Sequence, residues 1–303
     1  MTWRIVHIKD SDKIYLKFDN LEIRKLGETY TVPLNDISII ILEGNQTTIT
    51  AKLLVMLSKH NIALIVSDEK YMPTGLYLNY GNYHHSAKRS LQQIQWPLFL
   101  KEEVWGEIIR MKIENQRAAA DYFQVGEDRV RMLSVLHDNV VPGDKTNREG
   151  HAAKVYFNSL YGLDFTRNDN RIENYAMDYG YSIIRSAVAR NVVGSGLLSM
   201  LGIFHKNEFN SFNLVDDLME PFRPIMDYWI NEFVIGSKVY LSYENRLQLI
   251  DFLNQEMLSE GKKSNVNLVI QKYVQAFIKT METQDMHYLK RVHFSDFSEV
   301  NRK

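Results

Sequence analysis

From residue 2 to about residue 79, apolar and polar positions alternate with a period of two. The alternation runs through short segments rich in β-branched and aromatic residues, namely WRIVHIK, KIYLKF, LEIRKL and TYTVP. Turn-forming pairs such as Asp19-Asn20 separate these segments, so we predict short strands joined by turns. Residues 36–42 are more continuously apolar, which indicates a strand buried on both faces. One helix capped by Thr50 interrupts the series before a strand pattern returns at residues 62–68.

From residue 87 onward, apolar positions recur at the spacing typical of helices. Ile172, Ala176, Tyr179 and Ile183, for example, fall on one stripe. Helices are predicted over residues 87–95, 97–125, 128–138, 147–161, 172–192, 195–203, 214–234, 243–259 and 265–282. The polar, aromatic segment 79–86 is predicted to be a linker.

Strands first and helices afterwards indicate a segregated plan of two domains. We therefore predict an α+β protein with a small N-terminal β-sheet or sandwich domain that carries one helix, at residues 1–78. The linker leads into a larger all-α domain at residues 87–303, and that domain contains the candidate chemistry described below.

The composition is that of an ordinary globular protein, with 45% hydrophobic and 24% charged residues. There is no cysteine, which excludes disulfides and cysteine-ligated zinc sites. The N-terminal residues lack the apolar core of a signal peptide. The longest nearly apolar stretch, residues 192–204, is too short and too glycine-rich to span a bilayer. We therefore expect a cytoplasmic protein without membrane association.

The formal net charge of −1 argues mildly against a protein that holds duplex DNA by itself. Neutralisation of phosphates supplies most of the affinity of DNA-binding proteins, which therefore show a basic excess. If this chain binds DNA, its basic residues must gather on one face, or other subunits must complete the binding surface.

Glu149 is the first candidate functional residue. Asn147 is a good N-cap, so Glu149 lies in the first turn of the following helix, where the helix dipole favours an anion. Residues three, four, seven and eleven positions later are apolar or aromatic, so Glu149 continues an apolar stripe. A surface glutamate that only pairs with the helix dipole would give the same pattern.

His205 follows a glycine-containing apolar segment and is therefore presented at the end of an element. A hydrogen-bonded structural histidine would fit there equally well. Further along, Asp217 and Glu220 are three residues apart and would share one face of a helix. Pro221 and Pro224 each remove a backbone donor there, which either weakens a helix at its acidic pair or starts a new helix.

Together, Glu149, His205 and an acid at position 217 or 220 would suit a divalent ion such as Mg²⁺ or Mn²⁺. Such an ion can hold a phosphodiester oxygen and lower the pKa of an attacking hydroxyl. That chemistry needs neither a protein nucleophile nor a nucleotide-binding loop. Consistently, the chain contains no Walker-type loop, no G-x-S-x-G and no H-E-x-x-H.

The chain resembles a known family, the CRISPR-associated spacer integrases, which are the first Cas protein of the adaptation module. The N-terminal resemblance lies in residues 32–44, 47–50 and 62–66. Residues 147–153, 202–205 and 214–224 resemble the three metal-ligand motifs of the family, in the family's order. The resemblance covers nearly the whole chain and is greatest to members from type II systems.

The resemblance implies that Glu149, His205 and Glu220 ligate the metal, with Asp217 as a less certain fourth member. It implies a β-domain followed by an all-α catalytic domain. The implied reaction joins the 3′-hydroxyl of a short foreign DNA fragment to a phosphodiester at the border of a CRISPR repeat. A stand-alone nuclease acting on branched DNA would use the same residues. In a second alternative, a non-catalytic DNA-binding scaffold, the carboxylate cluster would be structural.

The resemblance also implies partners. Family members act as homodimers, for which we expect the N-terminal domain to be the dimerisation domain. A small ferredoxin-like second Cas protein bridges the dimers, and other type II Cas proteins are further expected partners. The basic residues nearest the motifs are candidates for contacts with DNA phosphates: Lys145, Arg148, Lys154, Lys206 and Arg223.

Overall fold

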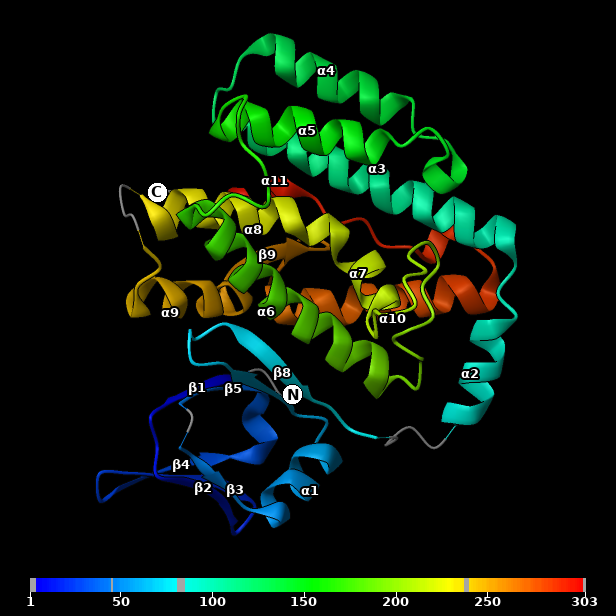
Figure 1. Cartoon of the computed structure of the whole chain (residues 1–303). Coiled ribbons are helices and arrows are strands. Elements are labelled where there is room, and N and C mark those ends of the chain that lie inside the picture. The colour runs from blue at the N-terminus through cyan, green and yellow to red at the C-terminus, as the bar shows by residue number, and fades with distance from the viewer. Residues whose placement is uncertain (1–3, 45, 81–84, 237–239, 302–303) are drawn as a thin grey trace. The chain divides into compact units, whose positions relative to one another are not determined.

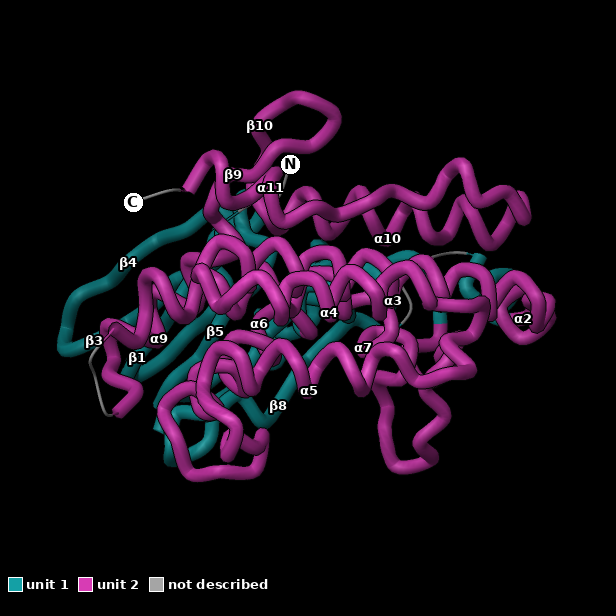
Figure 2. The backbone as a smooth tube through the Cα atoms, turned by 90° about the horizontal axis from the view of Figure 1, so that it is seen from above, with its two compact units in different colours: residues 1–90, 186–197 teal, residues 91–185, 198–303 magenta. Residues whose placement is uncertain are grey.

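The computed structural model describes residues 4–44, 46–80, 85–236 and 240–301 (Figure 1). The chain forms two compact units (Figure 2). Residues 1–90 and 186–197 form the N-terminal unit, and residues 91–185 and 198–303 form the helical unit. Of the predicted linker 79–86, residues 81–84 lie outside the described part of the chain.

The described part of the N-terminal unit contains two four-stranded sheets, helix α1, and the portions of α2 and α6 that it shares with the helical unit (Figure 1). The first sheet has the order β1 (Arg4–Lys9), β5 (Ile37–Glu43), β7 (Ala63–Ser67), β8 (Pro73–Tyr77). Its first three strands are parallel, and β8 is antiparallel to β7. The second sheet has the order β4 (Glu28–Pro33), β3 (Asn20–Lys25), β2 (Lys13–Lys17), β6 (Thr48–Ile49).

Both sheets contribute to one hydrophobic core, which explains the N-terminal sequence pattern. Ile14 of β2 and Ile40 of β5 lie in the same buried cluster as Leu53 of α1 (Ala51–Lys59). Every residue of β5 is buried, as its continuous apolar run predicts. The hydroxyl of Thr50 accepts a hydrogen bond from the Leu53 amide and caps α1, also as predicted.

The helical unit is built mainly of helices, which confirms the predicted fold class. Its helices are α2 (Ser86–Ile94), α3 (Leu98–Tyr122), α4 (Glu127–Asp138), α5 (Arg148–Tyr161), α6 (Ile172–Gly194), α7 (Asn213–Met219), α8 (Arg223–Trp229), α9 (Tyr243–Asp251), α10 (Val266–Thr283) and α11 (Phe294–Ser298). The first residues of α2 and the last residues of α6 belong to the N-terminal unit. Short 3₁₀ turns cover Pro142–Asp144, Glu220–Phe222, Phe252–Asn254 and Met286–Tyr288, and a π-helical turn covers Ile230–Ile235. Among the described residues, none of the helices has the length and apolarity needed to cross a membrane.

Two predictions about the helical part are wrong in detail. Residues 195–203 form turns and loop instead of a helix, because Gly196 adopts a positive φ and ends the preceding helix. The domain is also not entirely helical, since the predicted helix 243–259 ends at Asp251. A hairpin of β9 (Glu256–Ser259) and β10 (Lys262–Asn265) follows, and its turn uses positive φ at Glu260 and Gly261.

Helix α3 places polar side chains inside the helical unit. It packs against α4, α5 and α8, and most of its apolar residues are buried. Lys112, Asn115 and Gln116 are buried on the same helix at spacings of three and four. The Asn115 amide donates to the carbonyl oxygens of Pro221 (2.9 Å) and Val292 (2.9 Å). Asn115 thereby fixes the chain next to Glu220.

Candidate metal centre

Glu149 and Glu220 converge on a single cation, the ammonium of Lys112. The Lys112 Nζ lies 2.6 Å from a Glu149 oxygen and also contacts the Glu220 Oε2. Only 9% of the Lys112 side chain and 4% of the Glu220 side chain are exposed, against 22% for Glu149. Burial lowers the pKa of Lys112, but Glu220 and Glu149 outweigh this effect and raise it above its usual value. The two predicted carboxylates therefore surround one position suited to positive charge.

The first turn of α5 positions Glu149 as the sequence predicts. The Asn147 side chain accepts a hydrogen bond from the Gly150 amide at 3.3 Å and caps the helix. Asp144 adds a second cap, since its carboxylate accepts from the amides of Arg148 (2.9 Å) and Glu149 (3.0 Å). With these donors satisfied, the start of the helix is fixed beside α3.

A change of helix type positions Glu220. Helix α7 ends at Met219, a 3₁₀ turn covers Glu220–Phe222, and α8 begins at Arg223 with Pro224 in its first turn. The backbone N–H groups of a first helical turn have no acceptor within the helix, so proline, which lacks an N–H, is tolerated there. Of the two sequence interpretations, the one in which a proline starts a new helix describes this segment. The acid pair therefore does not act as one unit, and Asp217 and Glu220 bind different groups.

Asp217 holds the loop that carries His205. Its fully buried carboxylate accepts hydrogen bonds from the backbone amides of Ile203 (2.7 Å), Phe204 (3.1 Å) and His205 (3.1 Å). The same carboxylate lies 2.6 Å from the His205 Nδ1. Because Asp217 occupies Nδ1, Nε2 is the ring nitrogen that can face a metal ion.

The loop around His205 has room only for glycine at position 202. A Cβ at Gly202 would lie 2.4 Å from the His205 carbonyl oxygen and 2.7 Å from the Asp217 carboxylate. The Trp105 ring stacks on Phe204 with the ring centroids 4.3 Å apart and meets the His205 ring edge-on at 5.6 Å. The imidazole is thus held by Asp217 on one side and by an aromatic wall on another.

Charge in the centre is balanced by close pairing. The hydrogen bond to Asp217 raises the pKa of His205 against the effect of partial burial, and Glu220 and Glu149 raise it further. Burial raises the pKa of Glu220, but Arg223 and Lys112 lower it below its usual value, so Glu220 is ionised at neutral pH. The Arg223 Nε lies 2.8 Å from the Glu220 Oε1.

These residues suit a divalent cation. Among the described residues, no three acidic or histidine side chains are already gathered around one point. Two carboxylates, however, already meet at the Lys112 ammonium, and both influence His205 electrostatically. Carboxylate oxygens with one imidazole nitrogen form a donor set for Mg²⁺ or Mn²⁺. At the ammonium position itself, the two glutamates would supply carboxylate oxygens to the predicted ion once it takes the place of Lys112.

A cavity of about 240 Å³ opens onto the two glutamates. It is lined by Lys112, Gln116, Glu149, Phe157, Arg167, Tyr181, Glu220, Arg223 and Asp227. His205 is not among these lining residues. The guanidinium of Arg223 lies over the Tyr181 ring, 4.6 Å from its centroid, so the cavity combines positive charge with an aromatic wall. A phosphate group next to a sugar or base is a suitable ligand for such a surface.

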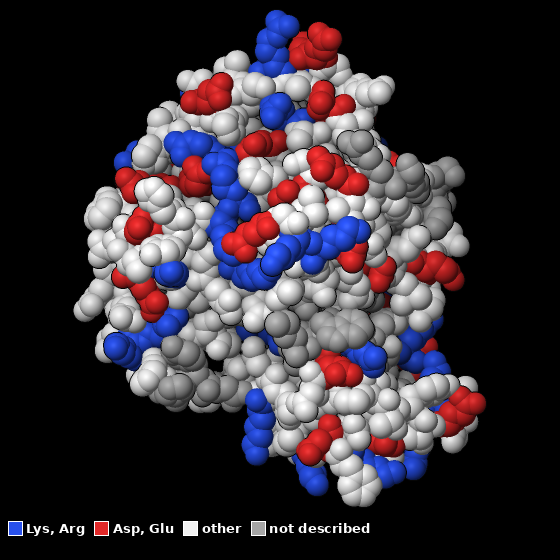
Figure 3. Space-filling view, turned by 180° about the vertical axis from the view of Figure 1, so that it is seen from behind, with Lys and Arg blue, Asp and Glu red and all other residues white. Residues whose placement is uncertain are grey.

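The structure separates the five candidate DNA contacts. Lys145, Lys154 and Lys206 are exposed, and Lys145 pairs with Glu102 at 3.0 Å. Arg148 is half-buried in α5, whereas Arg223 lies inside the cavity and is paired with Glu220. Seen from behind, Lys and Arg side chains gather into a band with acidic residues at its edges (Figure 3). The near-zero net charge therefore hides local basic regions.

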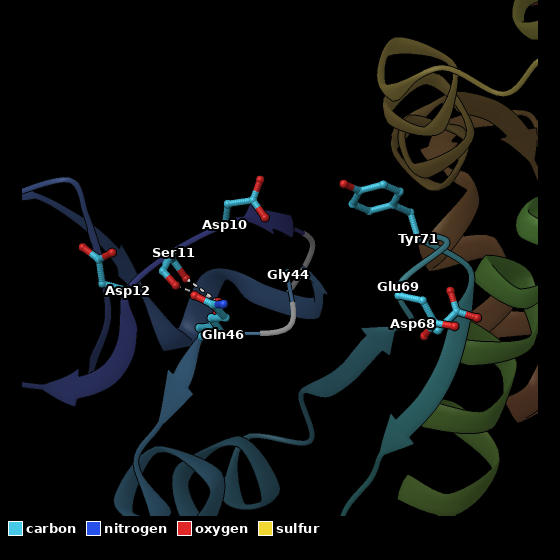
Figure 4. Close-up of a pocket in the computed structure, with 9 residues that line it drawn as sticks. Asp10, Ser11, Asp12, Gly44, Gln46, Asp68, Glu69 and Tyr71 are labelled. Atoms are coloured by element: carbon cyan, nitrogen blue, oxygen red, sulfur yellow. Dashed lines mark hydrogen bonds between the residues drawn. The ribbon is translucent and has the colours of Figure 1, made fainter.

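A second cavity, with several acidic residues around it, lies in the N-terminal unit and holds none of the predicted residues. It measures about 540 Å³ and includes Asp10, Asp12, Asp68 and Glu69. Figure 4 shows these carboxylates spread around the rim instead of converging. Asp68 accepts from the amides of Lys70 and Met72, and Asp12 accepts from that of Leu26. Two of these carboxylates therefore stabilise turns.

Sequence reasoning missed several cavity residues, namely Lys112, Gln116, Arg167, Tyr181 and Asp227. For Lys112 and Gln116 a signal was present. Both interrupt the apolar pattern of the predicted helix 97–125, and with Asn115 they form a polar patch on a buried helix face. Polar positions at such spacing on a core helix indicate a buried polar site.

Asp227 gives a prediction about stability. It is buried, and the Tyr181 hydroxyl donates to its carboxylate at 2.5 Å. Burial raises the pKa of Asp227 to about 7. Between the unfolded value near 4 and pH 7, the folded state therefore keeps a proton that the unfolded state has lost. The free energy of unfolding should fall by on the order of a few kcal/mol as pH rises through this range.

Asp227→Asn should remove this pH dependence and make the variant more stable than the wild type at pH 8. Urea denaturation at pH 4, 6 and 8 measures the difference. Asp128→Asn, at a carboxylate whose side chain is 79% exposed, serves as the control and should follow the wild type. Parallel pH profiles for Asp227→Asn and the wild type would contradict the prediction.

Comparison with known proteins agrees with this architecture. The family model described as CRISPR associated protein Cas1 matches residues 6–240. A curated relative from Neisseria meningitidis serogroup C, a CRISPR-associated endonuclease Cas1, is 39% identical over 293 residues, which cover 96% of each chain.

Two solved structures share the fold. A casposase bound to integration product matches with a TM-score of 0.75 and 18% identity, over 100% of this chain and 96% of that one. A chain of a Cas6-RT-Cas1–Cas2 complex matches with a TM-score of 0.74 and 18% identity. That match covers 95% of this chain but only 36% of the longer one.

Proposed function

The chain belongs to the Cas1 family of CRISPR-associated proteins, and on that premise we propose that it is a metal-dependent DNA endonuclease and integrase of CRISPR adaptation. One observation carries the proposal: Glu149 and Glu220, from separate helices, meet at one cation position. Asp217 holds the Nδ1 of His205, and both glutamates influence the His205 ring electrostatically. The curated relative is named an endonuclease, which supports enzymatic cutting of DNA.

The proposed reaction is a direct transesterification. The 3′-hydroxyl of a short DNA fragment attacks a phosphodiester at the border of a CRISPR repeat. A new phosphorus–oxygen bond forms, the bond to the 3′-oxygen of the neighbouring repeat nucleotide breaks, and that oxygen leaves with a proton. Cutting of branched DNA is the same displacement with a different nucleophile or in reverse. In no step does a side chain become covalently attached.

Glu149, Glu220 and the His205 Nε2 would hold Mg²⁺ or Mn²⁺. When bound, such an ion lowers the pKa of the attacking hydroxyl and neutralises charge on the phosphate. Asp217 acts through His205 by fixing the ring and its Nδ1, so we assign it as a positioning residue instead of a fourth ligand. Arg223 keeps Glu220 ionised and directed, and Lys112 and Arg167 add positive charge to the cavity.

We further propose that the DNA path is completed by other subunits. The net charge of −1 is low for a protein that holds DNA alone. The partners would be a second copy, joined through the β-rich residues 1–78, and a small ferredoxin-like second Cas protein. Residues 87–303 would form the catalytic domain. A chain of the solved Cas6-RT-Cas1–Cas2 complex shares the fold of this chain, which supports a partnership with a second Cas protein.

A joining assay tests the proposal. The protein and its small partner are incubated with Mn²⁺, a supercoiled plasmid carrying the repeat, and short duplexes ending in either a 3′-hydroxyl or a 3′-deoxy sugar. We expect covalent joining that requires the 3′-hydroxyl and is abolished by EDTA. Cutting of branched DNA without joining would favour a stand-alone nuclease. Binding of DNA without any product would favour a scaffold.

A further inference from the structure

Lys112 is a buried lysine bound by two of the residues proposed as metal ligands. It comes from the middle of α3, and among the described residues its ammonium forms ion pairs with Glu149 and Glu220 only. A buried ammonium is costly unless paired, so these contacts hold the side chain in place. The same contacts hold the two carboxylates together, because two carboxylates that share one ammonium would otherwise repel each other.

An ammonium and a divalent ion require the same oxygens here. Lys112 takes the Oε1 of Glu149 and the Oε2 of Glu220, whereas Arg223 takes the Oε1 of Glu220. An ion that coordinates both glutamates through these two oxygens must therefore replace Lys112, but it leaves the contact between Arg223 and Glu220 available. The displaced ammonium stays in the cavity, which already contains Arg167 and Arg223. The cavity is also lined by the carboxylates of Glu149, Glu220 and Asp227. A divalent ion held by the two glutamates would offset their charge, so that Lys112, Arg167 and Arg223 then favour an anionic occupant.

We propose that Lys112 competes with the divalent ion for Glu149 and Glu220, and that metal binding releases its ammonium to contact the DNA phosphate in the cavity. This inference rests on the proposed metal centre. Release of the Lys112 ammonium costs free energy, because it loses its carboxylate partners and stays near Arg167 and Arg223. A DNA phosphate in the cavity offsets this cost. Metal and DNA therefore strengthen each other's binding, because by linkage each favours the released lysine.

Calorimetric titration of Mn²⁺ into the full chain without DNA tests the competition. If the lysine-bound form is populated at about 90% or more, Lys112→Met should bind Mn²⁺ about tenfold more tightly or better. Lys112→Arg keeps a competing cation and should bind no more tightly than the wild type. Lys263→Met removes an exposed lysine paired with Glu256 at 3.0 Å and should leave the affinity unchanged. Equal or weaker binding by Lys112→Met would overturn the proposal.

A second measurement uses only the wild-type protein, in case Lys112→Met does not fold. Reductive methylation, analysed by mass spectrometry, reports the accessibility of individual lysines. The 9% exposed Lys112 side chain should be labelled slowly, and saturating Mg²⁺ or Mn²⁺ should raise its labelling severalfold. Lys263, whose side chain is 61% exposed, should be labelled equally in both conditions. Unchanged labelling of Lys112 at metal saturation would reject its release.

Glu149→Gln separates failure of this inference from failure of the proposed function. If neither the wild type nor Lys112→Met binds Mn²⁺, the metal centre itself is wrong. If the wild type binds Mn²⁺, Glu149→Gln does not, and Lys112→Met binds like the wild type, then the centre stands and only the competition is excluded.

Discussion

Replacement of Glu220 by glutamine should lower the rate of DNA joining by at least about a thousandfold, because it removes several kcal/mol of metal-dependent stabilisation of the transition state. The substitution keeps the shape of the side chain but removes the charge shared by Arg223 and Lys112. Lys112 retains Glu149 as a partner, so the helices around the centre should still assemble. The same loss should appear in the cutting of branched DNA.

The measurement compares wild type and Glu220→Gln in the joining assay, at a temperature at which circular dichroism shows both to be folded. Glu256→Gln is the matched control, since its side chain is 55% exposed and pairs with a surface lysine. That control should join DNA at the wild-type rate. Wild-type joining by Glu220→Gln would show that the metal assignment is wrong, although the family assignment would stand.

Replacement of Asp217 by asparagine should weaken metal binding by about ten- to a hundredfold without removing a proposed ligand. Asp217 accepts hydrogen bonds from three backbone amides and from the His205 ring. Asparagine has one acceptor oxygen in place of two, so a buried N–H loses its partner and the loop that carries His205 is destabilised. A drop in melting temperature should accompany the weaker binding.

The pH dependence of metal binding distinguishes this role from direct ligation. Metal needs the neutral imidazole, and the hydrogen bond to Asp217 raises the pKa of His205. Wild-type affinity should therefore fall as pH decreases through that raised pKa. In Asp217→Asn the fall should shift to lower pH, although the plateau affinity is weaker. An unshifted midpoint would indicate that Asp217 does not act through His205.

The sequence pattern predicted the fold well for segments whose structure depends on local chemistry or on burial along their whole length. The apolar run of β5, the Thr50 cap and the Asn147 cap each depend on local chemistry, and all three are confirmed. The β9–β10 hairpin was missed because its strands are four residues long and follow a genuine helix. Such a segment shows too few periods for strand and helix patterns to differ.

The candidate site shows a similar division. Glu149 and the acid pair Asp217 and Glu220 stood out because acids next to apolar residues are unusual in a sequence, and the family resemblance selected Glu220 from that pair. The structure brings the carboxylates of Glu149 and Glu220 together. The sequence did not reveal that Asp217 and Glu220 face different groups, because that depends on the 3₁₀ turn at Glu220–Phe222. Lys112 was missed because its two partners are 37 and 108 residues away, and only the tertiary fold makes it a neighbour of both.

The end of helix α6 limits how the chain can be divided. Residues 186–197 belong to the same compact unit as the N-terminal sheets, although more than a hundred residues separate them from β8. Within that unit, Arg190 donates to the Asn61 carbonyl oxygen at 2.6 Å, and a Cβ at Gly194 would lie 2.5 Å from the Asn61 amide nitrogen. A protease cut or a genetic recombination within residues 79–86 would therefore not yield two self-sufficient domains. An N-terminal fragment ending there would lack a helical segment of its own fold, and exchange of domains between related genes would have to carry both pieces together.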